Sequence, residues 1–330
     1  MLFDAIVISL AALLALAGLF QFLASRADAR TFPPPGRMID IGGRKLHARV
    51  TGTGAPVVVF ESGISASSVN WIPIQPQVST FAATCCYDRA GLGWSDSPTG
   101  TFDADRMVAD LAALLDRLNL PAPYVLVGHS YGGLLVRLFA ERYPGKVAAL
   151  VLIDPVLACH WAQPNSTRAR AKQRGALMAR WAGRLAGFGI IRLATSPIVV
   201  RSLILPRLAG KSESTEGAVY RLDSELRKLP PEIIPVIRAL WCRPKSFRAI
   251  LAHLAALESS FAALQNQPLA VPLTVISAGN TPPEGLAEHR AVARLSQRGE
   301  HIVAQRSGHW IQLDEPRLVV DAIRRAVDHA

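Results

Sequence analysis

The chain has 330 residues and is 50% hydrophobic, enough for one large globular core with an insertion, which argues against a disordered protein. Its cysteines lack metal-type spacing and fit a reducing compartment, although a disulfide between Cys159 and Cys242 stays open. The net charge of +11 is concentrated in residues 161–250, which carry 17 Lys or Arg against 5 Asp or Glu. Because no aromatic-interleaved basic motif occurs there, we expect no nucleic-acid partner. An anionic membrane surface or a solvated helical face accounts for the charge instead.

Residues 5–23 form an apolar run close to the length of a helix that crosses a bilayer. The four residues before it hold an acid and no Lys or Arg, whereas a cleaved signal peptide usually has a basic start and a shorter apolar core. We therefore expect a retained single-pass transmembrane helix within residues 1–30, with a cleaved signal as the alternative. Basic residues follow the run, so the positive-inside rule predicts a cytoplasmic catalytic domain, spaced from the membrane by a proline-rich linker at residues 31–36.

Strands and helices are predicted to alternate beyond the linker. Strands are expected at residues 45–50, 56–60, 82–87, 124–127, 148–153, 273–276 and 301–304, and amphipathic helices at residues 102–118 and 315–327. This alternation predicts an α/β fold with a mostly parallel, doubly wound sheet, formed by residues 37–155 and 269–330. Residues 156–268 are basic, rich in helical patterns and without a clear strand. We interpret them as a helical cap inserted into the core.

A nucleophile elbow is the most specific motif in the chain. Gly128-His129-Ser130-Tyr131-Gly132 has the form Gly-x-Ser-x-Gly and lies between a short apolar strand and a helical pattern. The tight strand-to-helix turn leaves no room for a Cβ two residues before or after the serine, which explains both glycines. Ser130 is therefore the predicted nucleophile.

The base and the acid of a serine mechanism also have candidates. His309 follows the last predicted strand and precedes the last helix, so it can reach the carboxyl edge of the sheet and act as the base. The acid is less clear, because the segment after residue 276 lacks an aspartate. Asp154, at the end of the preceding strand, is the favoured acid, and Glu284 is the alternative. Asp314 is expected to cap the final helix.

Backbone amides are the predicted oxyanion donors. The N–H of Tyr131 follows the nucleophile directly, and the turn after residue 60 offers the N–H of Ile64 next to Gly63. A second glycine-rich strand end contains Asp88 and Arg89. We interpret it as a structural loop that locks the neighbouring turns.

Together these motifs resemble the α/β-hydrolase superfamily, in particular bacterial membrane-anchored members with a lid, and the likeness spans residues 36–155 and 270–328. Two departures stand out: Ser62-Gly63 occupies a turn where the superfamily often has His-Gly, and no aspartate follows the seventh strand. An acid after the sixth strand, Asp154, would restore the triad. The matching pieces are residues 60–63 with Trp71, 87–91 with 95–96, 124–133, 152–155 and 308–309 with 314–316.

The expected function is hydrolysis of a carboxylic ester through an acyl-enzyme on Ser130, with a small-molecule ester or lipid-like substrate and no metal or organic cofactor. A serine at position 130 disfavours the dehalogenase and epoxide hydrolase branches, for which the resemblance would imply an aspartate. Amidase, thioesterase and lactonase activities remain open, as does a lyase or acyltransferase on the same scaffold. A non-catalytic membrane-tethered binding module is the least favoured hypothesis. The sequence does not fix the oligomeric state.

Overall fold

The computed structural model describes residues 1–100, 102–158, 167–196 and 228–330. The chain divides into two compact units. The larger unit comprises Pro34–Ala176 and Ala249–Ala330, and the smaller comprises Met1–Pro33 and Leu177–Arg248. The N-terminal helix therefore groups with Leu177–Arg248, a part of the segment that the sequence predicts to be a cap.

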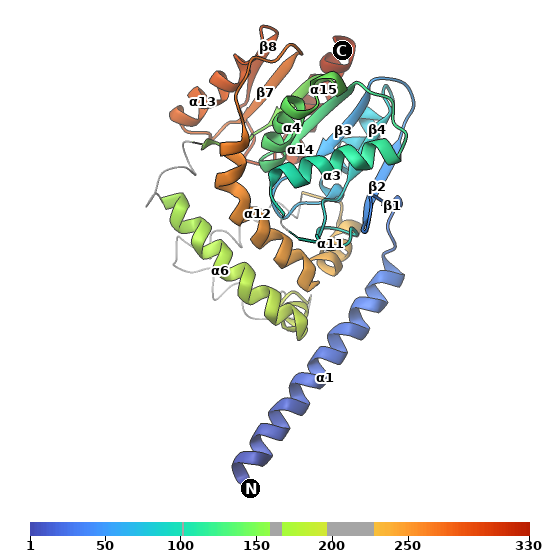
Figure 1. The fold of residues 1–330 in the computed structure, drawn as a ribbon, viewed down its shortest axis with the longest axis vertical. Helices are drawn as coiled ribbons and strands as arrows, with labels where there is room; N and C mark the ends of the chain where they lie inside the picture. The colour runs from blue at the N-terminus through green and yellow to red at the C-terminus, as the bar shows by residue number, and fades with distance from the viewer. Residues whose placement is uncertain (101, 159–166, 197–227) are drawn as a thin grey trace. The chain divides into compact units, whose positions relative to one another are not determined.

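The larger unit is built on one eight-stranded sheet with the order β1-β2-β4-β3-β5-β6-β7-β8 (Figure 1). The first two pairs in this order are antiparallel and all the others are parallel. The mostly parallel, doubly wound sheet predicted from the sequence is confirmed. The strands are β1 (Arg37–Asp40), β2 (Lys45–Thr51), β3 (Val57–Glu61), β4 (Thr84–Tyr87), β5 (Tyr124–His129), β6 (Val147–Ile153), β7 (Leu273–Ala278) and β8 (Gly299–Ala304).

Helices cover both faces of this sheet, so the central strands are apolar on both sides. Tyr124 and Leu126 of β5 pack into one buried cluster, whereas Val125 and Val127 pack into the cluster on the opposite face. The helical segments of this unit are η1 (Ser68–Trp71), α2 (Gln75–Val78), α3 (Ala104–Arg117), α4 (Tyr131–Arg142), η2 (Pro144–Lys146), α13 (Pro283–Ala293), α14 (Ile311–Asp314) and α15 (Pro316–Asp328). Residues of α3 and α4 belong to the first cluster, and residues of α2 and α15 belong to the second.

The strand order reverses direction between β3 and β5, and this reversal places the candidate site. In open parallel sheets, ligands bind beyond the carboxyl ends of the strands at such a switch point. The registers pair Glu61 with Gly128, His129 with Ile153, and Ile153 with Ile276. The loops after β3, β5, β6 and β7 therefore start side by side at one edge of the sheet.

The smaller unit is helical in its described part. It contains α1 (Leu2–Thr31), the C-terminal half of α6 (Thr167–Gly187), α7 (Ile190–Ala194), η3 (Pro231–Ile233), α11 (Ile234–Trp241) and the start of α12 (Pro244–Ala263). Among the described residues, α1 is the one helix long and apolar enough to cross a membrane, judged by length and composition alone. A signal sequence passes the same test, so this property does not by itself establish an anchor.

The cysteines of the described residues are free thiols, namely Cys85, Cys86 and Cys242. Cys159, the other half of the disulfide that the sequence left open, lies outside the described residues. Burial raises the pKa of the Cys85 thiol to about 12, so this side chain behaves as an apolar core residue.

Candidate active site

Ser130 has the strained backbone of a nucleophile elbow. It lies between β5 and α4 with φ 55° and ψ −121°, a backbone conformation that residues other than glycine rarely adopt. The two flanking glycines permit it, because a Cβ on Gly128 would lie 2.5 Å from the carbonyl oxygen of Gly132. A Cβ on Gly132 would in turn collide with the carbonyl oxygens that end β3 and begin the following turn. The elbow thus requires glycine on both sides of the serine.

His309 and Asp154 are in direct contact, although 154 residues separate them in the sequence. The Asp154 carboxylate lies 2.6 Å from the Nδ1 atom of His309. Asp154 follows β6 and also accepts hydrogen bonds from the backbone N–H of Ala278 and the hydroxyl of Thr281. Its φ of 39° is a second strained position at the same sheet edge. This arrangement fixes the carboxylate relative to the imidazole. Nε2 is the ring nitrogen that Asp154 does not contact.

Burial opposes the charged form of Asp154, but the hydrogen bond with His309 and the charge of that ring hold the pKa of the carboxyl below its usual value. Asp154 is therefore ionised at neutral pH. In this state its oxygens can only accept, so the Nδ1–H of His309 is the donor of this hydrogen bond.

Two contacts that the sequence did not reveal hold the loop of His309. The carbonyl of His309 accepts a hydrogen bond from the Nε2 atom of His129, 2.8 Å away, in the elbow itself. The Asp314 carboxylate accepts from the N–H of Gly308 at 2.9 Å. Asp314 was expected to cap the final helix, and this expectation is wrong, because the N-cap of α15 is Glu315. The spacing Gly308-x₅-Asp314 was the available signal, since an aspartate can accept from a nearby backbone N–H as well as cap a helix.

The turn after β3 lies directly against the elbow. A Cβ on Gly63 would be 3.2 Å from the Cβ of Ser130, so the backbone of this turn passes close to the serine. The next residue, Ile64, is half-buried. The other proposed donor, the N–H of Tyr131, belongs to the first residue of α4, where a helix has no acceptor of its own for the amide.

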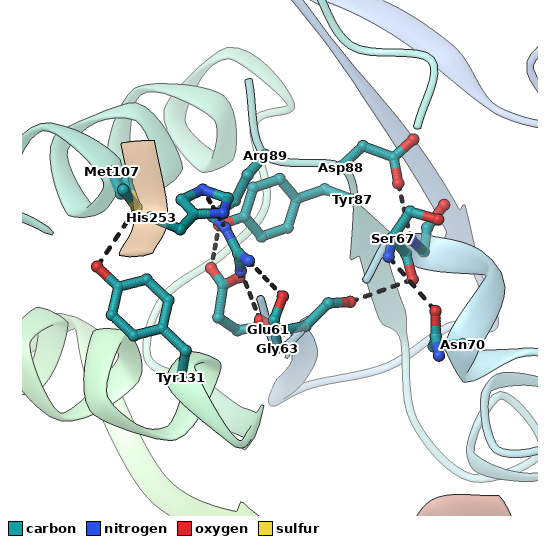
Figure 2. A network of polar contacts seen from close by, with 12 residues as sticks. Glu61, Gly63, Ser67, Asn70, Tyr87, Asp88, Arg89, Met107, Tyr131 and His253 are labelled. Atoms are coloured by element: carbon teal, nitrogen blue, oxygen red, sulfur yellow. Dashed lines mark hydrogen bonds and ion pairs between the residues drawn. The ribbon is translucent and has the colours of Figure 1, made fainter. Parts of the chain in front are cut away.

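Arg89 holds this turn through hydrogen bonds (Figure 2). Its guanidinium donates to the carbonyl oxygens of Ser62 and Gly63 and is paired with the Glu61 carboxylate. The Tyr87 hydroxyl donates to the same carboxylate. Because C=O and N–H of a trans peptide point in opposite directions, fixing the Gly63 carbonyl also fixes the direction of the following N–H, that of Ile64.

Neighbouring contacts complete this buried network. Asp88 accepts from the backbone N–H groups of Ser68 and Trp94 and contacts the imidazole of His47. The expectation that Asp88 and Arg89 lock neighbouring turns is confirmed. The Nε of Arg89 also approaches Nε2 of His253 at 3.4 Å, a contact with the middle of α12 that the sequence did not suggest.

The alternative acid, Glu284, lies on the exposed first turn of α13. Within the described residues no hydrogen bond joins it to His309, whereas Asp154 does make this contact. The described part of the chain also contains no group of three or more His, Cys, Asp or Glu side chains that could hold a metal ion.

Comparison with known proteins identifies the family of this fold. The family profile of the alpha/beta hydrolase fold matches residues 56–316, which include the elbow, Asp154 and His309. The chain belongs to the α/β-hydrolase family. The 2-hydroxy-6-oxo-2,4-heptadienoate hydrolase of Pseudomonas putida is 36% identical over 125 residues, which are 37% of this chain and 45% of that protein.

Solved structures share the fold across most of their length. A thermophilic esterase from Thermogutta terrifontis has a TM-score of 0.60 at 24% identity, covering 86% of this chain and 92% of its own. The enol-lactonase of Burkholderia xenovorans has a TM-score of 0.63 at 18% identity, covering 88% and 100%. At these identities the likeness concerns the fold alone. Sequence matches such as the one to the Pseudomonas enzyme span less than half the length of the relative.

His129 gives a pH-dependent prediction for stability. Burial, with the charge of His309, lowers the pKa of His129 from 6.5 to about 3, so the folded chain keeps it neutral. Between these values the unfolded state binds more protons, and stability is lost as the pH falls from 6.5 towards 3. In urea unfolding of the detergent-solubilised full chain, His129→Gln should reduce the stability lost between pH 7 and pH 5 by about 2 kcal/mol. An unchanged loss would contradict a neutral, buried His129.

Proposed function

We propose that this chain is a serine hydrolase that cleaves carboxylic esters through an acyl-enzyme on Ser130. The observation that carries the proposal is the contact between Asp154 and His309 at the same sheet edge as the strained elbow of Ser130. A charged carboxylate on Nδ1 directs the other ring nitrogen, Nε2, to serve as the base. The family of the chain, in which hydrolases and lactonases occur among the relatives, agrees with this reaction class.

The reaction would proceed in two steps. In the first, Nε2 of His309 accepts the Ser130 hydroxyl proton while Oγ attacks the ester carbonyl, and the resulting imidazolium then protonates the departing alcohol. In the second, His309 accepts a proton from water, which attacks the acyl-enzyme, and the proton returns to Ser130 as the acid product leaves. The Asp154 carboxylate stabilises the imidazolium in both steps without accepting its proton.

The negative charge on the carbonyl oxygen needs donors that are already in place. The backbone N–H groups of Tyr131 and Ile64 are the proposed pair. The second depends on Arg89, because the guanidinium holds the carbonyl on the other side of the Gly63–Ile64 peptide. The substrate is a small-molecule ester or a lipid-like ester, and the steps above involve no metal or organic cofactor.

We further propose that α1 anchors the enzyme in a membrane, with the catalytic domain in the cytoplasm. All large apolar residues of α1 that precede its one buried position, Gln21, are exposed. The basic residues Arg26, Arg30 and Arg37 follow the apolar run and favour the cytoplasmic side.

The nucleophile and base can be tested together. Ser130→Ala and His309→Ala should each lower kcat for a p-nitrophenyl ester by about 10⁴ to 10⁶, because a triad acts as a unit. Each removes side-chain atoms without changing the backbone, so thermal unfolding should stay close to that of the wild type. A folded Ser130→Ala variant with normal turnover would exclude the proposed mechanism.

The acid is tested by two nearly isosteric changes. Asp154→Asn should lower kcat by roughly 10² to 10⁴, since the amide cannot stabilise the imidazolium. Glu284→Gln serves as the matched control and should retain most of the activity, because that side chain is exposed on α13. The opposite ranking of the two variants would assign the role to Glu284.

Arg89→Lys tests the oxyanion turn. Lysine keeps the charge next to Glu61 but cannot hold two carbonyls in the planar fork that arginine provides. We expect kcat to fall by up to about 10³, the effect of losing one oxyanion donor, with a much smaller change in KM. A rise in KM alone would indicate that Arg89 shapes substrate binding instead.

The anchor is tested by extraction. Wild-type full chain should remain with membranes in alkaline carbonate, whereas Leu10→Arg combined with Leu14→Arg should release it, since each charge at a helix centre costs about 2.5 to 3.5 kcal/mol for insertion. The paired change Arg26→Gln and Arg30→Gln is a control that should stay in the membrane. A mature N-terminus beyond residue 23 in wild-type protein would instead identify a cleaved signal.

A further inference from the structure

The described part of α6 within the smaller unit has its large apolar side chains on the outside. Leu177, Trp181, Leu185 and Phe188 recur every three or four residues and are 37% to 56% exposed. Ala179 and Ala186, which a 3.6-residue period places on the opposite side, are buried. This is the reverse of an ordinary surface helix, which hides its large apolar residues. We call these four residues, the last of which directly follows α6, the α6 apolar face.

The charge around this face favours an anionic lipid surface over a protein partner of mixed charge. The α6 helix has no Asp or Glu, and the part of it that bears this face has two basic residues, Arg180 and Arg184. The guanidinium carbon of Arg184 lies 5.1 Å from the ring centroid of Trp181, so a cation lies over one aromatic ring of the face. Tryptophan with a neighbouring arginine is typical of helices that lie at a membrane–water interface.

Contacts inside the smaller unit connect this region to α1. Gln21, the one buried residue of α1, donates from Nε2 to the carbonyl of Cys242 at 2.8 Å and accepts from Nε of Arg192 at 3.0 Å. Arg192 also pairs with Asp28 at 2.7 Å, and both side chains are largely buried. The α7 helix, which contains Arg192, is thus fixed to the C-terminal third of α1.

These contacts begin near the end of the apolar run of α1, at Phe20 and Gln21. A Cβ on Gly189, the N-cap of α7, would lie 3.1 Å from the ring of Phe20. From Phe20 to Asp28 the helix rises only about 12 Å, at 1.5 Å per residue. If residues up to Phe20 span the bilayer, α7 and the end of α6 lie at its surface.

We propose that the α6 apolar face lies on the anionic surface of the bilayer that α1 spans, held there by the contacts of Gln21 and Asp28 with the α7 segment. The inference rests on the membrane anchor proposed above and does not depend on the hydrolase activity. Basic residues of α6 would then contact lipid phosphates while Trp181 and its neighbours enter the headgroup region.

The full chain in nanodiscs of phosphatidylglycerol tests this surface. Brominated acyl chains quench tryptophans that enter the bilayer, so wild-type fluorescence should be lower than in unbrominated discs. Trp181→Phe should abolish most of this difference, because its ring is the tryptophan of the α6 apolar face. Trp310→Phe, a change in the loop of His309, is the matched control and should leave the difference unchanged.

The outcomes that would overturn the proposal are distinguishable. If Trp181→Phe retains the wild-type quenching while the protein stays carbonate-resistant, the anchor exists and the α6 apolar face is not on lipid. If carbonate extracts the protein, the anchor itself is absent. A further change, Arg180→Gln with Arg184→Gln, should weaken the quenching in phosphatidylglycerol discs more than in phosphatidylcholine discs, and equal effects in both would contradict an anionic surface.

Discussion

The positive φ of Ser130 is the constraint on which the rest of the site depends. A strained backbone persists only where its surroundings enforce it, and here β5, α4 and the turn after β3 meet within van der Waals distance of one another. That close approach needs Gly128 and Gly132. It also brings Gly63 against the serine. The parallel register of β5 and β6 then places Asp154 at the same edge of the sheet as the elbow.

The buried ion pair of Arg89 and Glu61, next to the site, supports this geometry. The Glu61 carboxylate is fully enclosed, and burial raises its pKa in spite of the opposing charge of Arg89. Burying such a pair stabilises a fold little and can destabilise it, because both ions lose their hydration. The pair instead orients the backbone. The guanidinium donates to two carbonyl oxygens of the turn after β3 and so fixes the direction of the peptide that bears the Ile64 amide. Function accounts for this pair better than stability does.

The sequence predicted the elements whose residues carry a local signal. Short apolar runs predicted the central strands. Gly-x-Ser-x-Gly predicted the elbow, because both glycines meet a steric requirement at that point of the chain. The partnership of Asp154 with His309 followed only from strand order, which a sequence suggests but does not measure. Two contacts join residues more than 150 positions apart: His129 with the carbonyl of His309, and Arg89 with His253. No periodic pattern in the sequence predicts such contacts. The grouping of α1 with Leu177–Arg248 was likewise not apparent, since it depends on buried polar pairs in an otherwise apolar helix.

The central claim is that Ser130 forms the covalent intermediate, and one measurement tests it directly. Native protein is treated with a fluorophosphonate, digested, and the modified residue located by mass spectrometry. The account predicts one adduct, on Ser130, that does not form when the protein is unfolded first, because activation needs His309 and Asp154 in place. An adduct on a different serine of the native protein, or none at all, would contradict it.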